Sequence, residues 1–292
     1  MSSTFGYYPG CSLKGTGKEY DISIHAVAEI LSHELVEIPD WLCCGATSAH
    51  SINHALATAL AGDTLAKAQD AGQDKILAPC AMCYSRLATV TQQIQNDPKL
   101  AAKLEAALKR EKSGLADIKA LSVLDWLRDI PREELTAPIK KSFKDFKFAC
   151  YYGCLLVRPQ KVTHVENAEV PQDMERVLDT MGIQTVKWNM ATACCGASFS
   201  LSDKPTVFRL SKKIIDDARK AGANAIVVGC PMCHTNLDMR QTEFQPAEEQ
   251  IPVLYITQLM GLAYGIEPEK LGLNAHFVST EPITAALEAA AQ

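Results

Sequence analysis

The sequence predicts an α/β protein made of two tandem, pseudo-symmetric Rossmann-like domains, each with a parallel sheet. Short apolar stretches alternate with longer stretches of helical periodicity, as in parallel strands joined by helical crossovers. The order of these segments occurs twice, and residues 71–83 match residues 221–233 at a constant offset of 150. A repeat this long indicates duplicated domains, because solenoid repeats are only about 20 to 50 residues long.

In the first half, a strand at 5–8 is interrupted by Pro9 and Gly10, and further strands are expected at 36–38, 75–78 and 121–124. Helical spacing of apolar residues predicts helices at 21–33, 48–71, 84–94 and 99–112. Gly72 is a stop signal for the second of these helices, and a short helix is expected from Asp125.

The second half repeats this order after a charged segment, 131–144, that contains Pro138 and has no clear periodicity. We therefore predict domains at 1–140 and 141–292. In the second half we expect a strand at 147–152, a helix at 170–181 ending before Gly182, a strand at 184–187 and a closing strand at Val253-Leu254. With 292 residues, each domain is long enough to bury a core.

Composition excludes two classes of function. A net charge of −5 without a local run of Lys or Arg argues against nucleic acid as a partner. No uninterrupted apolar segment reaches the roughly 20 residues that a spanning helix needs, so no transmembrane segment is expected. Residues 1–13 lack a basic and then apolar export signal, which favours a cytoplasmic location.

The cysteines carry the functional signal. The sequence Cys-Cys-Gly-Ala occurs at 43–46 and again at 194–197, and ten of the eleven cysteines fall into two groups of five. The groups are Cys11, Cys43, Cys44, Cys80 and Cys83, and Cys154, Cys194, Cys195, Cys230 and Cys233. Each pair or single cysteine follows a predicted strand, so the loops at the carboxyl ends of parallel strands bring each group to one sheet edge.

Three structural interpretations of these cysteines are weaker than a redox one. Disulfides need an oxidising compartment, a structural zinc ion takes only four ligands and leaves one thiol over in each half, and inert core cysteines do not recur in register. Thiolates in a reducing compartment favour iron-sulfur clusters. A fifth thiol per group indicates an unusual cluster or one cysteine that is not a ligand.

With these two complete motifs, nearly the whole chain resembles the B subunit of heterodisulfide reductase, in the family of two-fold cysteine-rich (CCG) domain proteins. The resemblance implies that each group of five cysteines binds one non-cubane 4Fe-4S cluster. It also implies reduction of a disulfide, such as the coenzyme M–coenzyme B heterodisulfide, to two thiols, or the reverse reaction. The implied partners are a ferredoxin-like iron-sulfur subunit and, through it, a flavin subunit, because this chain lacks the ferredoxin spacing of cysteines.

The main alternative is an electron-transfer or anchoring CCG subunit of a succinate dehydrogenase-like or sulfur-oxidising complex. A zinc-stabilised scaffold is a third hypothesis. The sequence leaves open the substrate, the direction of reaction and the existence of a pocket between the clusters.

Other residues near the motifs are weaker candidates. His234 and Lys14 could act in proton transfer or anion binding, as could Tyr84, Arg86 and Arg158, although a solvated or structural role is more common for such side chains. Three further features have structural interpretations. Residues 230–234 spell a c-type haem motif that we regard as coincidental, Cys150 is expected to pack in the core, and the pair His50 and His54 is expected to form a polar helix face.

Overall fold

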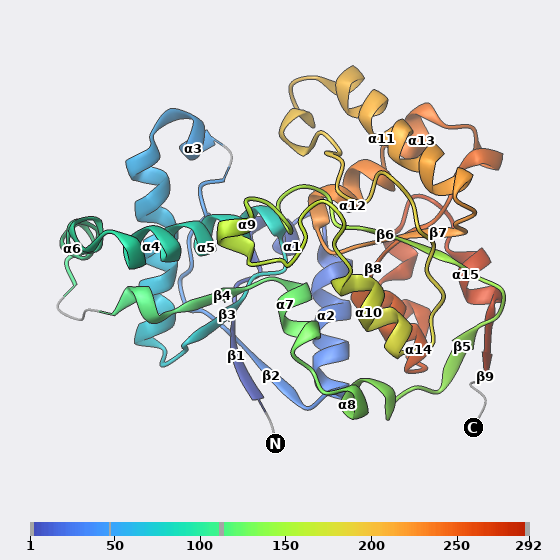
Figure 1. The fold of residues 1–292 in the computed structure, drawn as a ribbon, viewed down its shortest axis with the longest axis horizontal. Helices are drawn as coiled ribbons and strands as arrows, with labels where there is room; N and C mark the ends of the chain where they lie inside the picture. The colour runs from blue at the N-terminus through green and yellow to red at the C-terminus, as the bar shows by residue number, and fades with distance from the viewer. Residues whose placement is uncertain (1–2, 47, 111–113, 290–292) are drawn as a thin grey trace.

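The computed structural model describes residues 3–46, 48–110 and 114–289, and it confirms an α/β fold with two parallel sheets (Figure 1). The first sheet has the order β2-β1-β3-β4, and the second has the order β6-β7-β8. Their strands are β1 (Ser3–Tyr7), β2 (His33–Glu37), β3 (Lys75–Leu77), β4 (Lys119–Leu121), β6 (Phe148–Tyr151), β7 (Ala225–Val228) and β8 (Val253–Tyr255). Each sheet belongs to one copy of the repeated order of strand, loop and helix that the sequence predicts.

The predicted strand at 184–187 is replaced by a single parallel bridge between Phe148 and Thr185. The next ladder bond would run from the backbone N–H of Trp188 to the carbonyl of Cys150. The indole N–H of Trp188 donates to that carbonyl instead, at 3.0 Å. A side chain has therefore taken the acceptor that a longer strand needs.

Two first-half predictions are corrected by helix caps. The helix predicted at 48–71 is two helices, α3 (Ser48–Ile52) and α4 (His54–Asp70), because Asn53 is extended and its side chain accepts a hydrogen bond from the N–H of Leu56. The strand predicted at 121–124 ends at Leu121. Ser122 and Asp125 form a capping box that begins α7 (Val123–Arg128).

The remaining helices of the first half follow the predicted order, with shifted ends. The helix predicted at 99–112 ends at residue 107, and the last residues of that prediction, 111 and 112, lie outside the described part. These helices are α1 (Gly10–Lys14), α2 (Lys18–Ile30), α5 (Ala81–Asn96) and α6 (Pro98–Ala107), with the 3-10 helix η1 (Leu115–Asp117).

The segment 131–144, for which the sequence predicts no regular structure, contains α8 (Arg132–Thr136) and β5 (Lys141–Phe143). β5 pairs in antiparallel fashion with β9 (Leu287–Ala289), close to the end of the chain. The sequence signal is too short here, since each element spans five residues or fewer. The boundaries 1–140 and 141–292 stay a prediction.

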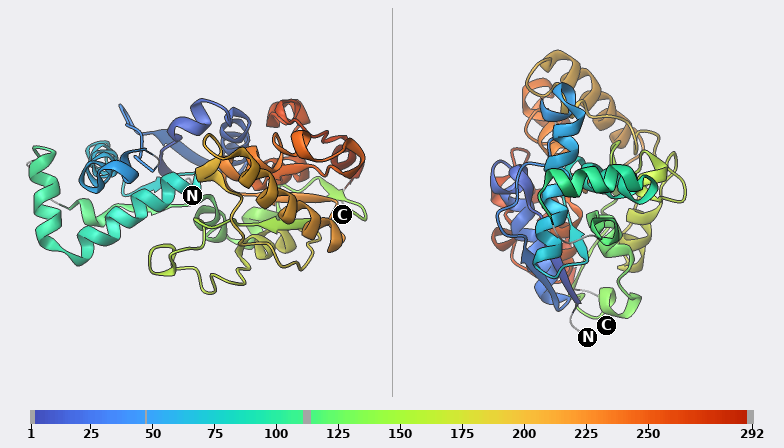
Figure 2. Two further views of the ribbon diagram at one scale, coloured as in Figure 1. Left: turned by 90° about the horizontal axis from the view of Figure 1, so that it is seen from above. Right: turned by 90° about the vertical axis from the view of Figure 1, so that its left-hand side faces the viewer.

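The helices of the second half lie toward the opposite end of the long axis from α4 and α6, except α9, which packs against α5 (Figures 1 and 2). They are α9 (Gln160–Thr163), α10 (Asp173–Thr180), α11 (Lys204–Lys220), α12 (Pro231–Leu237), α13 (Gln241–Phe244), α14 (Ile256–Ala263) and α15 (Glu281–Ala285). Short 3-10 helices are η2 (Ala197–Phe199), η3 (Ala247–Glu249), η4 (Pro268–Leu271) and η5 (Leu273–Ala275).

Helices of each half pack against helices of the other half across their boundary. α2 of the first half packs against α14 of the second, and α10 of the second packs against α7 of the first (Figure 1). One hydrophobic cluster therefore contains buried residues of both halves, while a second cluster lies entirely in the first half. This arrangement fixes the two sheets relative to each other.

Stacked aromatic rings and buried hydrogen bonds hold α2 in this position. The rings of Tyr20 and Tyr255 stack at 4.0 Å with an interplanar angle of 5°. The hydroxyl of Tyr20 donates to the carbonyl of Gly229 at 3.3 Å, and the hydroxyls of Ser23 and Thr257 lie 2.7 Å apart. Because these groups are buried, removing one partner of either hydrogen bond would lower stability.

We expect Ile24→Ala on α2 to lower the free energy of unfolding by about 2–5 kcal/mol, since the side chain is fully buried in the shared cluster. Ile22→Ala is the matched control, because Ile22 on the same helix is 46% exposed and its loss should change stability by only about 0.5 kcal/mol. Denaturant unfolding followed by two probes, one in each half, checks this. A shared core predicts one transition that shifts as a whole, whereas a shift confined to the first-half probe would contradict it.

Candidate functional site

The structure places the cysteines of both groups in loops or first helical turns. Most follow a strand, as predicted, whereas Cys194 and Cys195 follow the single bridge at Thr185. Cys11 follows β1 within α1, Cys43 and Cys44 follow β2, and Cys80 directly precedes α5. All eleven cysteines are free thiols, so the disulfide alternative has no support.

The first group comes together around Cys83, and we call it the first thiol set. The sulfur atoms of Cys44 and Cys83 are 3.4 Å apart, and the thiols of Cys80 and Cys83 form a hydrogen bond. Cys43 interacts with Cys44 and with Cys11. Cys11 and Cys43 are exposed, whereas the other three cysteines are buried.

The second group forms an equivalent second thiol set. The sulfur atoms of Cys195 and Cys233 are 3.6 Å apart. Hydrogen bonds link Cys154 to Cys194 and Cys230 to Cys233. Again one side of the set is accessible, at Cys154 and the exposed Cys194, and the other side is buried.

The two thiol sets meet at their buried sides. The side chains of Cys80 and Cys230, which match at the offset of 150, lie close enough to interact electrostatically with each other. The backbone N–H of Ala81, at the start of α5, also donates to the sulfur of Cys230. Spacing in the sequence could not show this contact, since it depends on how the two sheets face each other.

Two glycines leave room for sulfur. Gly10 and Gly153 precede the first cysteine of each set and have φ of +63° in both halves. A Cβ atom at these positions would lie 3.1 Å from the sulfur of Cys83 and 3.0 Å from that of Cys233. The glycines therefore allow both the left-handed backbone and the close approach, and the clustered thiols fit a thiolate-held metal cluster.

Two buried tyrosines that no sequence motif singled out position the Cys-Cys-Gly loops. The hydroxyl of Tyr8 donates to the carbonyl of Leu42 and that of Tyr151 donates to the carbonyl of Ala193, both at 2.7 Å. Each carbonyl belongs to the residue just before a Cys-Cys pair. The available signal was the repeat itself, because each tyrosine lies three residues before the first cysteine of its set.

Hydrogen bonds to sulfur favour thiolates at one cysteine of each Cys-Cys pair. Donation from Cys154, followed by the N–H groups of Gly196 and Ala197, lowers the pKa of Cys194 to about 6. Donation from Cys83, followed by the N–H of Ala46 and the charge of Arg86, lowers the pKa of Cys44 to about 7. These groups are thus ready to bind a metal cluster, since the thiolate is the ligand form.

The two sets differ at one matched position. Arg86 on α5 lies near Cys44, and its buried Nε atom has no hydrogen-bond partner. The matched residue on α12, Asn236, donates to the carbonyl of Cys195 at 3.1 Å and contacts its sulfur at 3.6 Å. The first set therefore has a nearby cation where the second has a neutral amide.

Two of the other predicted candidates have partners away from the thiols. Lys14 pairs with Glu37 at 2.7 Å on the surface. The hydroxyl of Tyr84 hydrogen-bonds with Asp125, and burial is the main reason that its pKa is raised above the usual range.

Arg158 braces the second Cys-Cys loop from outside. Its guanidinium pairs with Glu169 at 2.7 Å and donates to the carbonyl of Thr192 at 3.0 Å. Cys150 is fully buried in β6, as its predicted packing role requires, and burial raises the pKa of its thiol. The rings of His50 and His54 contact each other edge to face at 4.7 Å.

His234 is buried directly behind the second thiol set. Its Nε2 atom lies 3.1 Å from the carbonyl of Val253, and its ring stacks on Tyr255. Burial and then the neighbouring His276 hold its pKa well below the usual range, so the imidazole is neutral.

Comparison with known proteins agrees with this geometry. The CCG cysteine-rich domain matches residues 5–88 and 148–238, the two segments that carry the thiol sets. The chain belongs to the two-fold CCG cysteine-rich domain family. The two matched segments end before the last elements of each half, so the family signature covers the thiol loops and the strands that position them.

Two curated members of this family are similar over most of their length. The 8-methylmenaquinol:fumarate reductase membrane anchor subunit of Wolinella succinogenes is 30% identical over 281 residues, 95% of this chain and 98% of the relative. The B subunit of a CoB-CoM heterodisulfide reductase of Methanosarcina acetivorans is 30% identical over 258 residues, 85% of each chain. The two relatives carry different functional names at equal identity.

A solved structure supports the fold alone. A hypothetical protein from Helicobacter pylori aligns with a TM-score of 0.76 and 11% identity, covering 95% of this chain and 52% of that one. In addition, none of the described helices of the CCG protein has the length and apolar character required to cross a membrane.

We expect Tyr151→Phe to loosen the second Cys-Cys loop, because the carbonyl of Ala193 loses its donor. The free energy of unfolding should fall by about 0.5–1.5 kcal/mol, and the protein should retain less iron. Tyr264→Phe is the matched control, since it removes a similarly buried hydroxyl that donates to the carbonyl of Leu135 at 3.1 Å, far from both sets. Iron analysis with urea unfolding under anaerobic conditions checks both variants, and equal iron contents would contradict the role given to Tyr151.

Proposed function

We propose that the chain is a catalytic subunit like the B subunit of heterodisulfide reductase, with two non-cubane 4Fe-4S clusters, one held by each thiol set. In the forward direction it reduces a disulfide to two thiols, and in the reverse direction it oxidises two thiols to a disulfide. The coenzyme M–coenzyme B heterodisulfide, or an analogous disulfide, is the proposed substrate class. Similarity to the heterodisulfide reductase subunit supports this assignment.

The contact between Cys80 and Cys230 is the observation that carries the proposal. Breaking a disulfide consumes two electrons and two protons and yields two thiols. When bound, each cluster supplies one-electron redox chemistry. Two sets that share a buried boundary can therefore serve one substrate with two electrons.

Each thiol set has buried thiols and thiols that are open to solvent. The thiols at the boundary of the two sets, Cys80, Cys83, Cys230 and Cys233, are buried and keep water out. The exposed Cys11 and Cys43 of the first set and Cys194 of the second set are the thiols that a disulfide could reach from solvent. Arg86 supplies a positive charge near Cys44, and this charge would stabilise the reduced state of the first set.

A second candidate function follows from the relative in Wolinella succinogenes, which is named as a membrane anchor subunit. On this alternative, the CCG protein transfers electrons or anchors a complex and does not itself cleave a disulfide. The same two thiol sets would serve both functions, so only an assay with substrate separates them.

We also propose a hetero-oligomeric complex. A ferredoxin-like iron-sulfur subunit would deliver electrons to this chain, and a flavin subunit would in turn supply electrons to that ferredoxin-like subunit. The chain itself has no Cys-x2-Cys-x2-Cys-x3-Cys-Pro segment to bind a further cluster of the ferredoxin kind. The cytoplasmic location stays a prediction from the sequence.

This function is tested with anaerobically purified protein. Its iron and acid-labile sulfide are measured, and its reduction of a disulfide is assayed with a reduced viologen dye as electron donor. We expect Cys194→Ser to lose iron from one set and nearly all reductase activity. Cys150→Ala is the control, because Cys150 belongs to neither set. This variant should retain both its iron and its reductase activity. Full iron content without disulfide reduction would favour the electron-transfer alternative, and zinc without iron would overturn both.

We expect Arg86→Asn, which installs the residue of the second set, to lower one of two cluster reduction potentials. Removing a cation disfavours the added electron, and a tenfold change in the reduction equilibrium corresponds to about 59 mV for one electron. Redox titration followed by electron paramagnetic resonance measures the shift. Arg132→Asn, on the distant α8, is the control and should leave both reduction potentials unchanged. If both potentials were also unchanged in Arg86→Asn, the electrostatic role of Arg86 would be contradicted.

A further inference from the structure

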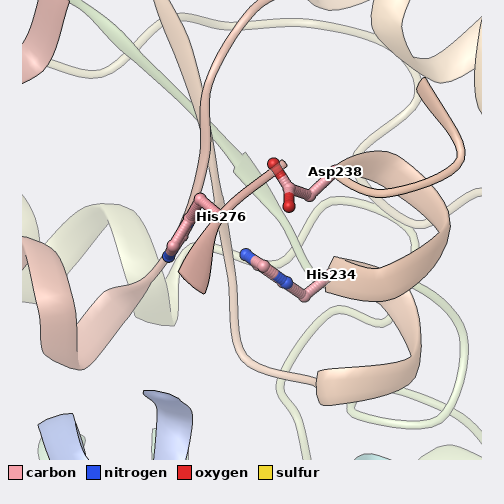
Figure 3. A group of neighbouring side chains, drawn as sticks. All are labelled: His234, Asp238 and His276. Carbon is pink, nitrogen blue, oxygen red and sulfur yellow. The ribbon is translucent and has the colours of Figure 1, made fainter. Parts of the chain in front are cut away.

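Three potential metal ligands gather behind the second thiol set: His234, Asp238 and His276 (Figure 3). One ligand atom from each lies within 4.8 Å of the other two. His234 belongs to α12, Asp238 caps the end of that helix, and His276 follows η5. None of the three belongs to the thiol sets.

The carboxylates near this cluster lack a cation. Asp238 is 1% exposed and Glu19 is 8% exposed, and burial raises the pKa of both, that of Asp238 to about 7. Within the described ranges, no Lys or Arg forms an ion pair with either carboxylate. Buried carboxylates are normally paired with a cation or bound to a metal.

His234 is oriented as metal-binding histidines commonly are. A carbonyl can only accept a hydrogen bond, so the Nε2 atom that faces the carbonyl of Val253 must carry the ring proton. In the neutral ring, Nδ1 then keeps its lone pair, and it lies 4.0 Å from Glu19. Donation of the second ring N–H to a backbone carbonyl is the usual way of orienting a ligating imidazole.

His276 approaches from the other side of the cluster. Its ring meets that of His234 edge to face at 4.7 Å and 86°. Its Nε2 atom lies 2.9 Å from the amide nitrogen of Gln258, which can only donate, so Nε2 accepts and the proton of the neutral ring lies on the buried Nδ1. Metal binding at Nδ1 therefore requires that proton to move to Nε2, with the carbonyl oxygen of the Gln258 amide turned toward Nε2 to accept it.

Space for a further ligand lies next to these side chains. A cavity of about 210 Å³ is lined by Glu19, His234, Asp238 and Thr16, among others. At the matched positions of the first half, 150 residues earlier, the chain has Tyr84 and Ala88. The fold therefore does not require this cluster, which is specific to the second half.

We propose that His234, Asp238 and His276 bind one divalent transition-metal ion of the zinc class, with the fourth coordination position facing the cavity beside Glu19. Two imidazoles and a carboxylate are common zinc donors. Because zinc bonds of about 2.0–2.1 Å need closer ligands, binding draws the three side chains together. The ion would connect the helix that carries Cys233 to the segment after η5.

Zinc itself is the probe. Anaerobic protein is dialysed against Zn²⁺, its zinc and iron are counted by mass spectrometry, and the zinc shell is read by X-ray absorption. We expect about one zinc per chain with nitrogen and oxygen neighbours at about 2.0–2.1 Å and no sulfur at about 2.3 Å. His276→Ala should weaken zinc binding by more than the roughly 10- to 100-fold that loss of an outer-shell partner costs. His54→Ala, which removes an exposed histidine far from this cluster, should bind zinc as the wild type does.

Iron content separates this proposal from the proposed function, since neither histidine variant should change it. Asp238 also accepts the N–H groups of Phe277 and Val278, so its loss could disturb folding, and His276→Gln is the second variant. Loss of zinc in both His276 variants with iron retained supports the site. No bound zinc, sulfur in its shell, or undiminished binding by the His276 variants would overturn it.

Discussion

The contact between the ends of β3 and β7 organises the protein. Each strand delivers a cysteine, Cys80 or Cys230, to the start of a helix, and the two side chains interact across the boundary of the halves. Five cysteines can gather at one sheet edge in a single Rossmann-like domain. Only two such edges facing each other can place two thiol sets side by side.

The packing of helices across the boundary explains how this contact is maintained. α2 contacts β2 of its own sheet and also packs on α14, and α10 packs on α7. Neither half could rotate without exposing the buried stack of Tyr20 on Tyr255. The relative position of the thiol sets therefore depends on a hydrophobic interface, and the thiols need not hold the halves together themselves.

Much of the fold and both thiol sets could be predicted from the sequence, because their signals are local. Strand and helix periodicity lies within ten or so residues, and the paired motifs repeat in register. Errors arose where one side chain decided the outcome, as when Trp188 took the ladder acceptor at Cys150 or Asn53 began a new helix. The loop bonds of Tyr8 and Tyr151 and the contact of Cys80 with Cys230 join residues far apart, so no local pattern reports them.

The duplication also shows where the two halves differ. The glycines, the loop-binding tyrosines and the cysteines match in both halves, which is expected because close packing against sulfur restricts these positions. Further along α5 and α12, Arg86 stands opposite Asn236 and Tyr84 opposite His234. These positions lie close enough to change the electrostatic environment of a thiol set without altering its geometry. Two sets built alike can thereby differ in how readily they accept an electron, and this difference would give the proposed two-electron reaction a defined order.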